Sequence, residues 1–284
     1  MDPQHAPYPF DRVTVRSRIS GGGTRISWTF DEMFQDPLPH TFTLQGSRSS
    51  VSTATWTNIG SAATNTDHLV DGEDRLFADE QDYQYRVKLV TTKGTYYSPG
   101  VGADNRLDFR DWRIARDVIR KETLRHDRYT SLPGWLLKRR KEGPKCPLCL
   151  DPVGNPDDSR CPRCFGTRYD GGYFAGEFTY LQLEVNADNI DTDPQLGTIQ
   201  NSNTIENCRM LGDPTPQTRD VFVDGKTDRR YMIETIVSSA VIRSYPVVTT
   251  IILRPVGLGD IIYDFETPDD LPESDRDLLT PGLA

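Results

Sequence analysis

Residues 82–100, DYQYRVKLVTTKGTYYSPG, decide the fold of the N-terminal third of the chain. Apolar and polar side chains alternate along this stretch, and successive side chains of a strand point to opposite faces of a sheet. Lys93 and Gly94 form a turn signal, so the TYYS that follows is expected to return as the second strand of a hairpin. One face of the first strand therefore collects four residues: Tyr83, Tyr85, Val87 and Leu89.

The same alternation extends back to Val13. The runs VTVRSRIS (13–20) and TRISWTF (24–30), joined through three glycines, indicate strand, turn and strand, with Trp28 directed inward. Further short runs separated by turn residues continue to Gly100. About seven short strands in so few residues predict a β-sandwich over residues 13–100, preceded by an N-terminal arm at 1–12.

Two of these segments resemble the fibronectin type III family. In that family a buried tryptophan lies on the second strand and a YxYRV segment enters the sixth; here ISWTF contains Trp28, and residues 83–87 are YQYRV. The resemblance covers about a third of the chain. It implies a binding or spacer module that carries no catalysis, a role that an unrelated sandwich would share.

The overall charge excludes a protein whose whole surface binds nucleic acid. The chain has 33 Lys and Arg against 42 Asp and Glu, a net charge of −9, and only 36% of its residues are hydrophobic. The charges are distributed unevenly, because residues 107–145 are basic and residues 260–284 are acidic. Such opposed segments favour contacts between copies or with neighbouring proteins. No apolar run is long enough to span a membrane, and we expect a soluble, non-secreted protein.

Residues 101–145 are expected to form a basic amphipathic helix of about five turns, interrupted at Leu132-Pro133-Gly134. Asp108 is the expected N-cap. The apolar stripe at three- and four-residue spacing comprises Phe109, Trp112, Ala115, Val118 and Ile119. The candidate interaction residues of this segment are Arg110, Arg113, Arg116, Arg120, Lys121, Lys138, Arg139 and Arg140.

Two CxxC motifs provide the clearest chemistry. CPLC contains Cys146 and Cys149, and CPRC, which follows after eleven residues, contains Cys161 and Cys164. Four thiolates in two such turns suit Zn²⁺, which is borderline soft and accepts a tetrahedral site. Iron or an iron–sulfur cluster is the alternative, since four cysteines also hold these. A closed four-cysteine site leaves no position for water or substrate, so the predicted zinc is structural.

The second motif continues as CPRCFGT and resembles the zinc-ribbon type, in which a CxxCxGT turn leads into a strand. We therefore expect a zinc ribbon at residues 146–172. The rest of the chain returns to alternation, and a β-rich domain is expected over 173–265, with a long polar arm at 188–220 and an acidic tail at 266–284. Cys208 is expected to be a lone buried thiol. The predicted fold class is thus mainly β with a minor α part.

No sequence motif indicates an active site. DGKT at residues 224–227 is similar to the end of a phosphate-binding loop, but that loop needs glycine at the position of Asp220, so a hairpin turn is expected. The histidines are scattered without ligand spacing, and we expect them on the surface: His5, His40, His68 and His126. The chain is therefore not expected to be an enzyme.

Residues 212–265 resemble the terminal part of neck and connector proteins of tailed bacteriophages. In those proteins an aspartate, a strand, an RY pair, another strand, a proline and a closing DxxY-type segment recur. The matching positions here are Asp220, Arg230, Tyr231, Pro246, and 260–263. The resemblance covers about a fifth of the chain.

This resemblance implies a structural virion protein, assembled in the host cytoplasm, that joins head to tail. It further implies a homo-oligomeric ring that contacts portal or tail proteins, with non-specific contact with packaged DNA and none with membrane. A zinc-ribbon protein that binds nucleic acid through residues 107–145 is one alternative, and a baseplate or tail decoration protein is another.

Overall fold

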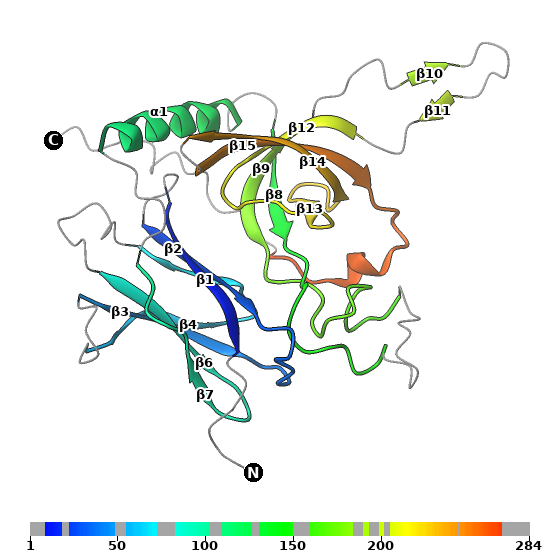
Figure 1. Cartoon of the computed structure of the whole chain (residues 1–284). Coiled ribbons are helices and arrows are strands. Elements are labelled where there is room, and N and C mark those ends of the chain that lie inside the picture. The colour runs from blue at the N-terminus through cyan, green and yellow to red at the C-terminus, as the bar shows by residue number, and fades with distance from the viewer. Residues whose placement is uncertain are drawn as a thin grey trace. The chain divides into compact units, whose positions relative to one another are not determined.

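The computed structural model describes residues 9–18, 23–48, 55–72, 83–102, 109–126, 131–149, 160–183, 190–192, 199–201, 205–242 and 245–268 (Figure 1). The chain divides into two compact units. Unit 1 comprises Met1–Trp112 and Arg140–Ala175, and unit 2 comprises Arg113–Arg139 and Gly176–Ala284. The described residues contain one α-helix among many strands, which confirms a mainly β chain with a minor α part. None of the described helices has the length and apolar character required to span a bilayer.

Unit 1 contains two antiparallel sheets with a common core. The three-stranded sheet has the order β1 (Phe10–Ser17), β2 (Thr24–Phe30) and β5 (His68–Asp71). The four-stranded sheet has the order β4 (Thr57–Thr64), β3 (Thr41–Ser47), β6 (Gln84–Val90) and β7 (Thr95–Tyr97). The first strand begins at Phe10, three residues before the expected start.

The core of unit 1 is built by the alternation that the sequence displays. Tyr83 and the three inward residues of β6 are buried, as expected, together with Trp28 of β2. The ring of Trp28 lies 4.6 Å from the ring of Phe42, so the two sheets meet through aromatic side chains. The hydroxyl of Tyr85 donates to Asp71 at 3.0 Å, which satisfies a polar atom that would otherwise be costly in this core.

Unit 2 is organised around a closed six-stranded barrel with the order β12–β15–β14–β13–β8–β9. Its strands are β8 (Ser131–Leu137), β9 (Glu177–Gln182), β12 (Ile205–Leu211), β13 (Val221–Asp224), β14 (Arg230–Ile242) and β15 (Tyr245–Pro255). A separate hairpin is formed by β10 (Ile190–Thr192) and β11 (Ile199–Asn201). Buried apolar side chains from the barrel strands fill its interior, and Cys208 is among them, as predicted.

The five-turn helix expected in the basic segment 101–145 is present, but the segment is not helical beyond the expected interruption at Leu132-Pro133-Gly134. Helix α1 spans Phe109–Arg125, whereas residues 131–137 form strand β8. Pro133 is compatible with this strand because β13 pairs with β8 only from Gly134 onward, so no partner on that side needs a proline N–H. On α1, Ala115 and Ile119 are buried, in agreement with the predicted stripe. Asp108, the expected N-cap, lies outside the described residues.

The predicted arm at 188–220 also differs from expectation. Its residues 205–211 form barrel strand β12, in which Met210 is fully buried. The polar composition of the preceding residues concealed this strand in the sequence. Most of the N-terminal arm and most of the acidic tail lie outside the described residues.

Two of the four histidines are buried, contrary to the surface position expected. His40 is 2% exposed and packs edge-on against Phe30 and Phe42, while its Nε2 lies 3.0 Å from the carbonyl oxygen of Asp36. His126 is 1% exposed, with Nδ1 2.7 Å from Ser131 Oγ. Burial lowers the pKa of His40, and it lowers the pKa of His126 to about 4.

The segment after β15 is held to the barrel by a buried arginine. The guanidinium of Arg230 donates to the carbonyl oxygens of Ile262 and Phe265, and it lies over the ring of Tyr263. Asp260 caps the short 3-10 helix Ile261–Asp264 by accepting from the Ile262 amide at 3.0 Å. Three positions of the connector resemblance, Arg230, Asp260 and Tyr263, thus belong to one group of contacts.

Candidate metal centre

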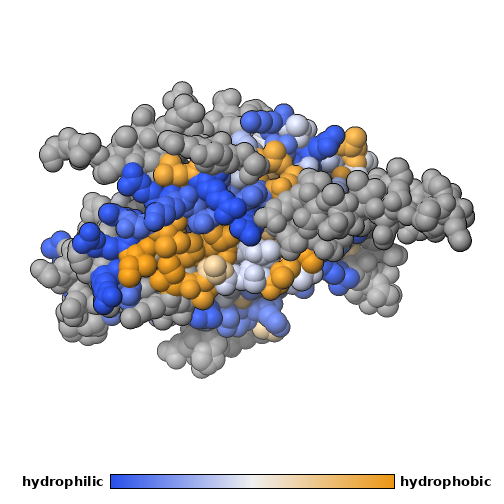
Figure 2. Space-filling model, turned by 90° about the horizontal axis from the view of Figure 1, so that it is seen from above, coloured by the Kyte–Doolittle hydropathy of each residue, from blue (hydrophilic) through white to orange (hydrophobic). Residues whose placement is uncertain are grey.

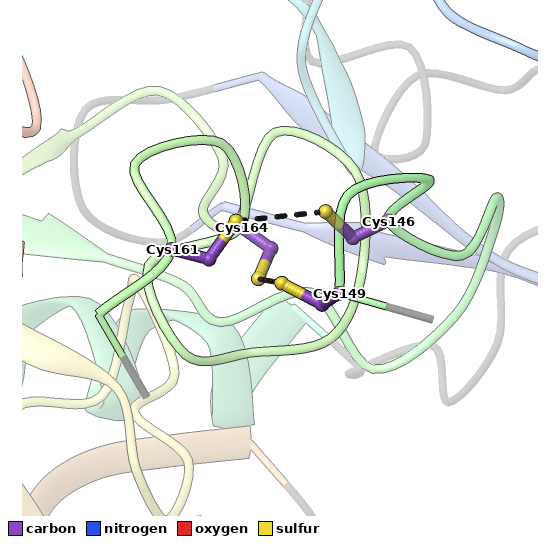
Figure 3. A group of neighbouring side chains, drawn as sticks. All are labelled: Cys146, Cys149, Cys161 and Cys164. Carbon is purple, nitrogen blue, oxygen red and sulfur yellow. Dashed lines mark hydrogen bonds between the residues drawn. The ribbon is translucent and has the colours of Figure 1, made fainter. Parts of the chain in front are cut away.

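The two CxxC turns bring four sulfurs together inside unit 1 (Figure 3). The Sγ atoms of Cys146 and Cys161 are 3.8 Å apart, those of Cys149 and Cys164 are 3.4 Å apart, and all four lie within 4.8 Å of one another. A disulfide would need about 2.05 Å, so all four are free thiols. In a tetrahedral zinc site with bonds of about 2.3 Å, neighbouring sulfurs are about 3.8 Å apart. The spacing of these sulfurs therefore fits a metal of that size.

Burial closes this site to solvent. None of the four cysteines is more than 8% exposed, and they pack together as a cluster of their own. A buried group of four thiols can hold a metal ion, and its ligands leave no open coordination position for a substrate. Such an ion would stabilise the folded conformation of the surrounding chain and would take no part in a reaction.

Main-chain amides point at the first sulfur of each turn. Cys146 Sγ accepts from the amides of Leu148 and Cys149, and Cys161 Sγ accepts from those of Arg163 and Cys164. Burial raises the pKa of Cys149. For Cys161 burial acts in the same direction, but hydrogen bonds from Cys149 and from the two amides outweigh it and lower the pKa to about 7. Such amides stabilise the thiolate form that a metal requires.

The second turn is tightened by the residues that follow it. The amides of Phe165 and Thr167 donate to the carbonyl oxygens of Cys161 and Cys164 at 2.8 and 2.9 Å. Gly172 adopts a φ of +65°, and a Cβ there would lie 2.8 Å from the Cys164 carbonyl oxygen. Only glycine fits this position without displacing the turn.

An ion pair between Arg163 and Asp170 links the second CxxC turn to the residues that follow it. Arg163, inside CPRC, donates to both carboxylate oxygens of Asp170, at 2.5 and 2.8 Å. These hydrogen bonds are the main reason why the pKa of Asp170 is lowered. Neither Arg163 nor Asp170 was predicted from the sequence. Their only sequence signal is the pairing of opposite charges seven residues apart across a glycine-containing turn.

The two turns are joined to each other by main-chain hydrogen bonds. The Cys146 amide donates to the Arg168 carbonyl oxygen, and the Asp170 amide donates to the Pro144 carbonyl oxygen, both at 2.9 Å. Lys145 and Tyr169 form an isolated bridge between these bonds. The connecting residues 150–159 lie outside the described part of the chain.

The cysteine segment is also bonded to the sheets of unit 1. Glu142 Oε2 accepts from the Phe30 amide at 2.5 Å, and burial raises the pKa of Glu142. The side-chain amide of Gln35 donates to the Gly143 carbonyl oxygen at 3.2 Å, while its oxygen accepts from the Lys145 amide at 3.0 Å. The metal centre therefore belongs to the same compact unit as the two sheets, although its sequence lies between strands β8 and β9 of the barrel.

The predicted interaction residues separate into two groups. The five on α1 are exposed: Arg110, Arg113, Arg116, Arg120 and Lys121. The other three have internal roles. Lys138 is buried with Nζ 3.5 Å from Glu177 Oε1, and the main-chain amide of Arg139 donates to Asp220 at 2.9 Å. Arg140 is buried, stacks 4.2 Å over the Phe174 ring and has a pKa lowered to about 10 by burial. Lys138 and Arg140 therefore do not contribute to an exposed basic surface.

Comparisons with protein-family models, with curated proteins and with solved structures found no match for this chain.

Proposed function

We propose that the four-cysteine centre binds one structural zinc ion. The carrying observation is the burial of four free thiols whose sulfurs all lie within 4.8 Å of one another, with main-chain amides directed at two of the sulfurs. Iron would fit the same ligands, and metal analysis of protein purified without added metal decides between them. About one equivalent of zinc and no colour is the expected result; stoichiometric iron with visible absorption would overturn the assignment.

The two sheets of unit 1 are proposed to be a fibronectin type III-like sandwich. Support comes from the strand numbers: buried Trp28 lies on β2, the second strand, and the YQYRV segment runs into β6, the sixth. Such a domain acts as a binding or spacer module. Residues 13–100 expressed alone are expected to unfold in one cooperative thermal transition, and a fragment without such a transition would count against the proposal.

The whole chain is proposed to be a structural virion protein of a tailed phage, working as one copy of a homo-oligomeric ring at the neck. Support comes from the connector resemblance, since Arg230, Asp260 and Tyr263 interact in the folded chain and so have a shared structural reason to occur together. A closed metal centre that can only stabilise the fold also suits a structural role.

The ring proposal is tested by imaging phage particles in which this chain carries a label, together with native mass spectrometry of the purified protein. A closed ring of one subunit number at the junction of head and tail is expected. Isolated copies scattered over a capsid or tail surface would overturn the ring and support a decoration role.

A second candidate function is nucleic-acid binding by helix α1, favoured by its five exposed basic residues. Exposed Asp117 reduces that positive charge, and burial of Lys138 and Arg140 removes two further contributions. Binding to DNA fragments at several salt concentrations tests it. Affinity that falls steeply with salt, and that is lost when Arg116 and Arg120 are both replaced by Glu, would support this function. Undetectable binding at low salt would remove it.

A further inference from the structure

Strand β14 has one edge that is only partly paired among the described residues. This strand pairs with β13 only through Arg230, Tyr231 and Met232, but it pairs with β15 as far as Ile242. The side of residues 235–242 that faces away from β15 therefore has no strand partner among the described residues. Unpaired main-chain N–H and C=O groups along such an edge can pair with another chain.

The composition of this edge is unusual for a surface strand. Residues 235–242 are TIVSSAVI, without a charged residue or proline, and residues 235–241 are all exposed. Their exposed apolar side chains include Ile236, Val237 and Val241. Figure 2, seen from the side on which Figure 1 draws β14 and β15, shows a gathered area of hydrophobic surface bordered by hydrophilic residues. Natural edge strands are usually protected by lysine, proline or bulges. Residues 235–242 contain neither lysine nor proline; the register irregularities leave Glu234 and Val237 as extra residues on β14, and Val247 as an extra residue on β15.

The bulge determines which side chains share a face. Ile236 lies opposite Ile251 and Ser238 opposite Thr250, so Val237 is the additional residue and the alternation resumes after it. Ile236, Ser239 and Val241 then lie on one face, while Thr235, Ser238, Ala240 and Ile242 lie on the other. The 3.3 Å contact of Ser239 Oγ with Thr249 Oγ1 agrees with this assignment.

This pattern is complementary to itself. When two copies of the edge run antiparallel about a two-fold axis at Ser239, Thr235 faces Ile242 and Ile236 faces Val241. Ser238 faces Ala240, and Ser239 faces Ser239 of the partner subunit. Every such pair lies on one face, as a two-fold axis perpendicular to a sheet requires.

We propose that the edge 235–242 of β14 is covered by the same edge of a second copy of this chain, giving a continuous sheet across a two-fold axis at Ser239. An isologous contact of this kind joins two copies and cannot close a ring by itself. It therefore goes beyond the head-to-tail contacts of the proposed ring. If both contacts form, two rings are joined face to face.

The experiment uses sedimentation velocity of the full chain over a range of concentrations, on the wild type and on two charge variants. Ser239→Lys and Ser239→Glu each place like charges opposite each other at the axis, so each should raise the dissociation constant of the pair about tenfold or more. Ser61→Lys makes the same substitution at an exposed position of strand β4 in unit 1 and should leave the constant unchanged. Far-UV circular dichroism and thermal unfolding of each variant verify the fold.

Mixing the two variants tests the two-fold axis itself. Because residue 239 faces its own copy, an equimolar mixture of the Lys and Glu variants should recover association as a heterodimer. Wild-type chain that stays monomeric, or variants that associate like the wild type, would overturn the proposal. So would variants that dissociate and stay apart when mixed, because the edge would then bind a different segment or protein.

The outcome is separable from the ring proposal. The ring is read from the subunit number of the wild type, whereas the two-fold contact is read from the charge-swap mixture. If the wild type forms no ring but the mixed Lys and Glu variants associate, the ring proposal is wrong and the pairing of β14 edges stands. If the wild type forms a ring and neither substitution at Ser239 changes association, the pairing of β14 edges is wrong and the ring proposal stands.

Discussion

Single side chains around the four cysteines support the metal centre through the main chain. Thr167 Oγ1 donates to the Cys164 carbonyl oxygen at 2.8 Å, and Arg163 holds Asp170 below the turn. These contacts are made by groups other than the sulfurs and help to order the second turn. The sulfurs, by contrast, are close together without covalent bonds, so a bound ion is needed to offset the burial of negative charge once they ionise.

Replacing Cys161 with Ser is expected to lower the bound metal from about one equivalent to near zero, because a hydroxyl is a poor soft ligand. Metal content after gel filtration measures this. Cys208→Ala is the matched control, since Cys208 is a buried cysteine of the barrel that forms no disulfide and lies outside the cluster. Retention of a full equivalent by the Cys161 variant would contradict the ligand assignment.

Burial of two histidines makes the stability of the fold depend on pH. The pKa of His126 is about 4 in the folded chain, below the ordinary value of about 6.5, so the unfolded chain binds a proton first as pH falls. Its contribution to stability is complete above pH ~6.5 and is lost as pH falls toward 4. This linkage is worth about 3 kcal/mol at most. His40, whose pKa is also lowered by burial, acts in the same direction.

His126→Asn should reduce the loss of unfolding free energy between pH 7 and pH 4.5. Asparagine keeps a polar atom near Ser131 and does not ionise in this range. Urea unfolding at several pH values measures the effect, with His68→Asn, at a half-buried histidine, as the control. An unchanged pH dependence in the His126 variant would show that other groups dominate acid destabilisation.

At the scale of elements, close approach of strands β8 and β13 depends on one glycine. A Cβ on Gly134 would lie 2.1 Å from the Val223 carbonyl oxygen and 2.7 Å from the Phe222 ring. Both contacts involve the barrel wall, and the first is with main chain that cannot rotate away. The proline and glycine that seemed to interrupt a helix in the sequence thus occupy a strand whose register leaves room for them.

Gly134→Ala is therefore expected to lower the unfolding free energy of the barrel by about 3 kcal/mol. Gly257→Ala, at a position where a Cβ would meet nothing within 4 Å, is the control and should change little. Thermal and urea unfolding compare the two variants. Equal stability of both would show that the barrel wall relaxes around the added methyl group.

Strand alternation and cysteine spacing are local signals, and they predicted most of what is local. The inward face of β6, the turn after β13 and the four cysteines follow from neighbouring residues. Strand β12 did not, because its pairing with β15 and β9 depends on residues far away in the sequence. The burial of Arg140 could not be predicted for the same reason, since the ring that it packs against, Phe174, lies far from it in the sequence.

At the scale of the whole molecule, the chain passes from unit 2 to unit 1 and back between β8 and β9. The barrel pairs Leu136 with Glu177, and the entire cysteine segment lies between them in sequence. A metal ion bound by the four cysteines would therefore stabilise unit 1, although the chain segment that contains the cysteines begins and ends in the barrel strands of unit 2. No sequence pattern indicates that the chain leaves unit 2 after β8 and re-enters it at β9, because the residues of both strands are typical of any strand.

Removal of the metal with a chelator should therefore affect the two units differently. Amide hydrogen exchange is expected to accelerate about tenfold or more in residues 140–149 and 160–175, and at Phe30, which bonds Glu142. Strands β8, β9 and β13 should keep their protection. The Cys161→Ser variant, already without metal, should show no further change on chelation. Equal acceleration in both units would mean that they unfold as one.

The insertion between β8 and β9 also has a kinetic consequence. Closing the barrel requires two strands separated by about 40 residues to meet, and the entropy of closing a loop grows with the logarithm of its length. A metal that has already gathered residues 146–164 shortens the freely moving chain by about half, which lowers that entropic cost by about 0.6 kcal/mol. Metal binding before barrel formation would thus make the pairing of β8 with β9 faster. Chains that bind the ion early are expected to fold about threefold faster than chains without it.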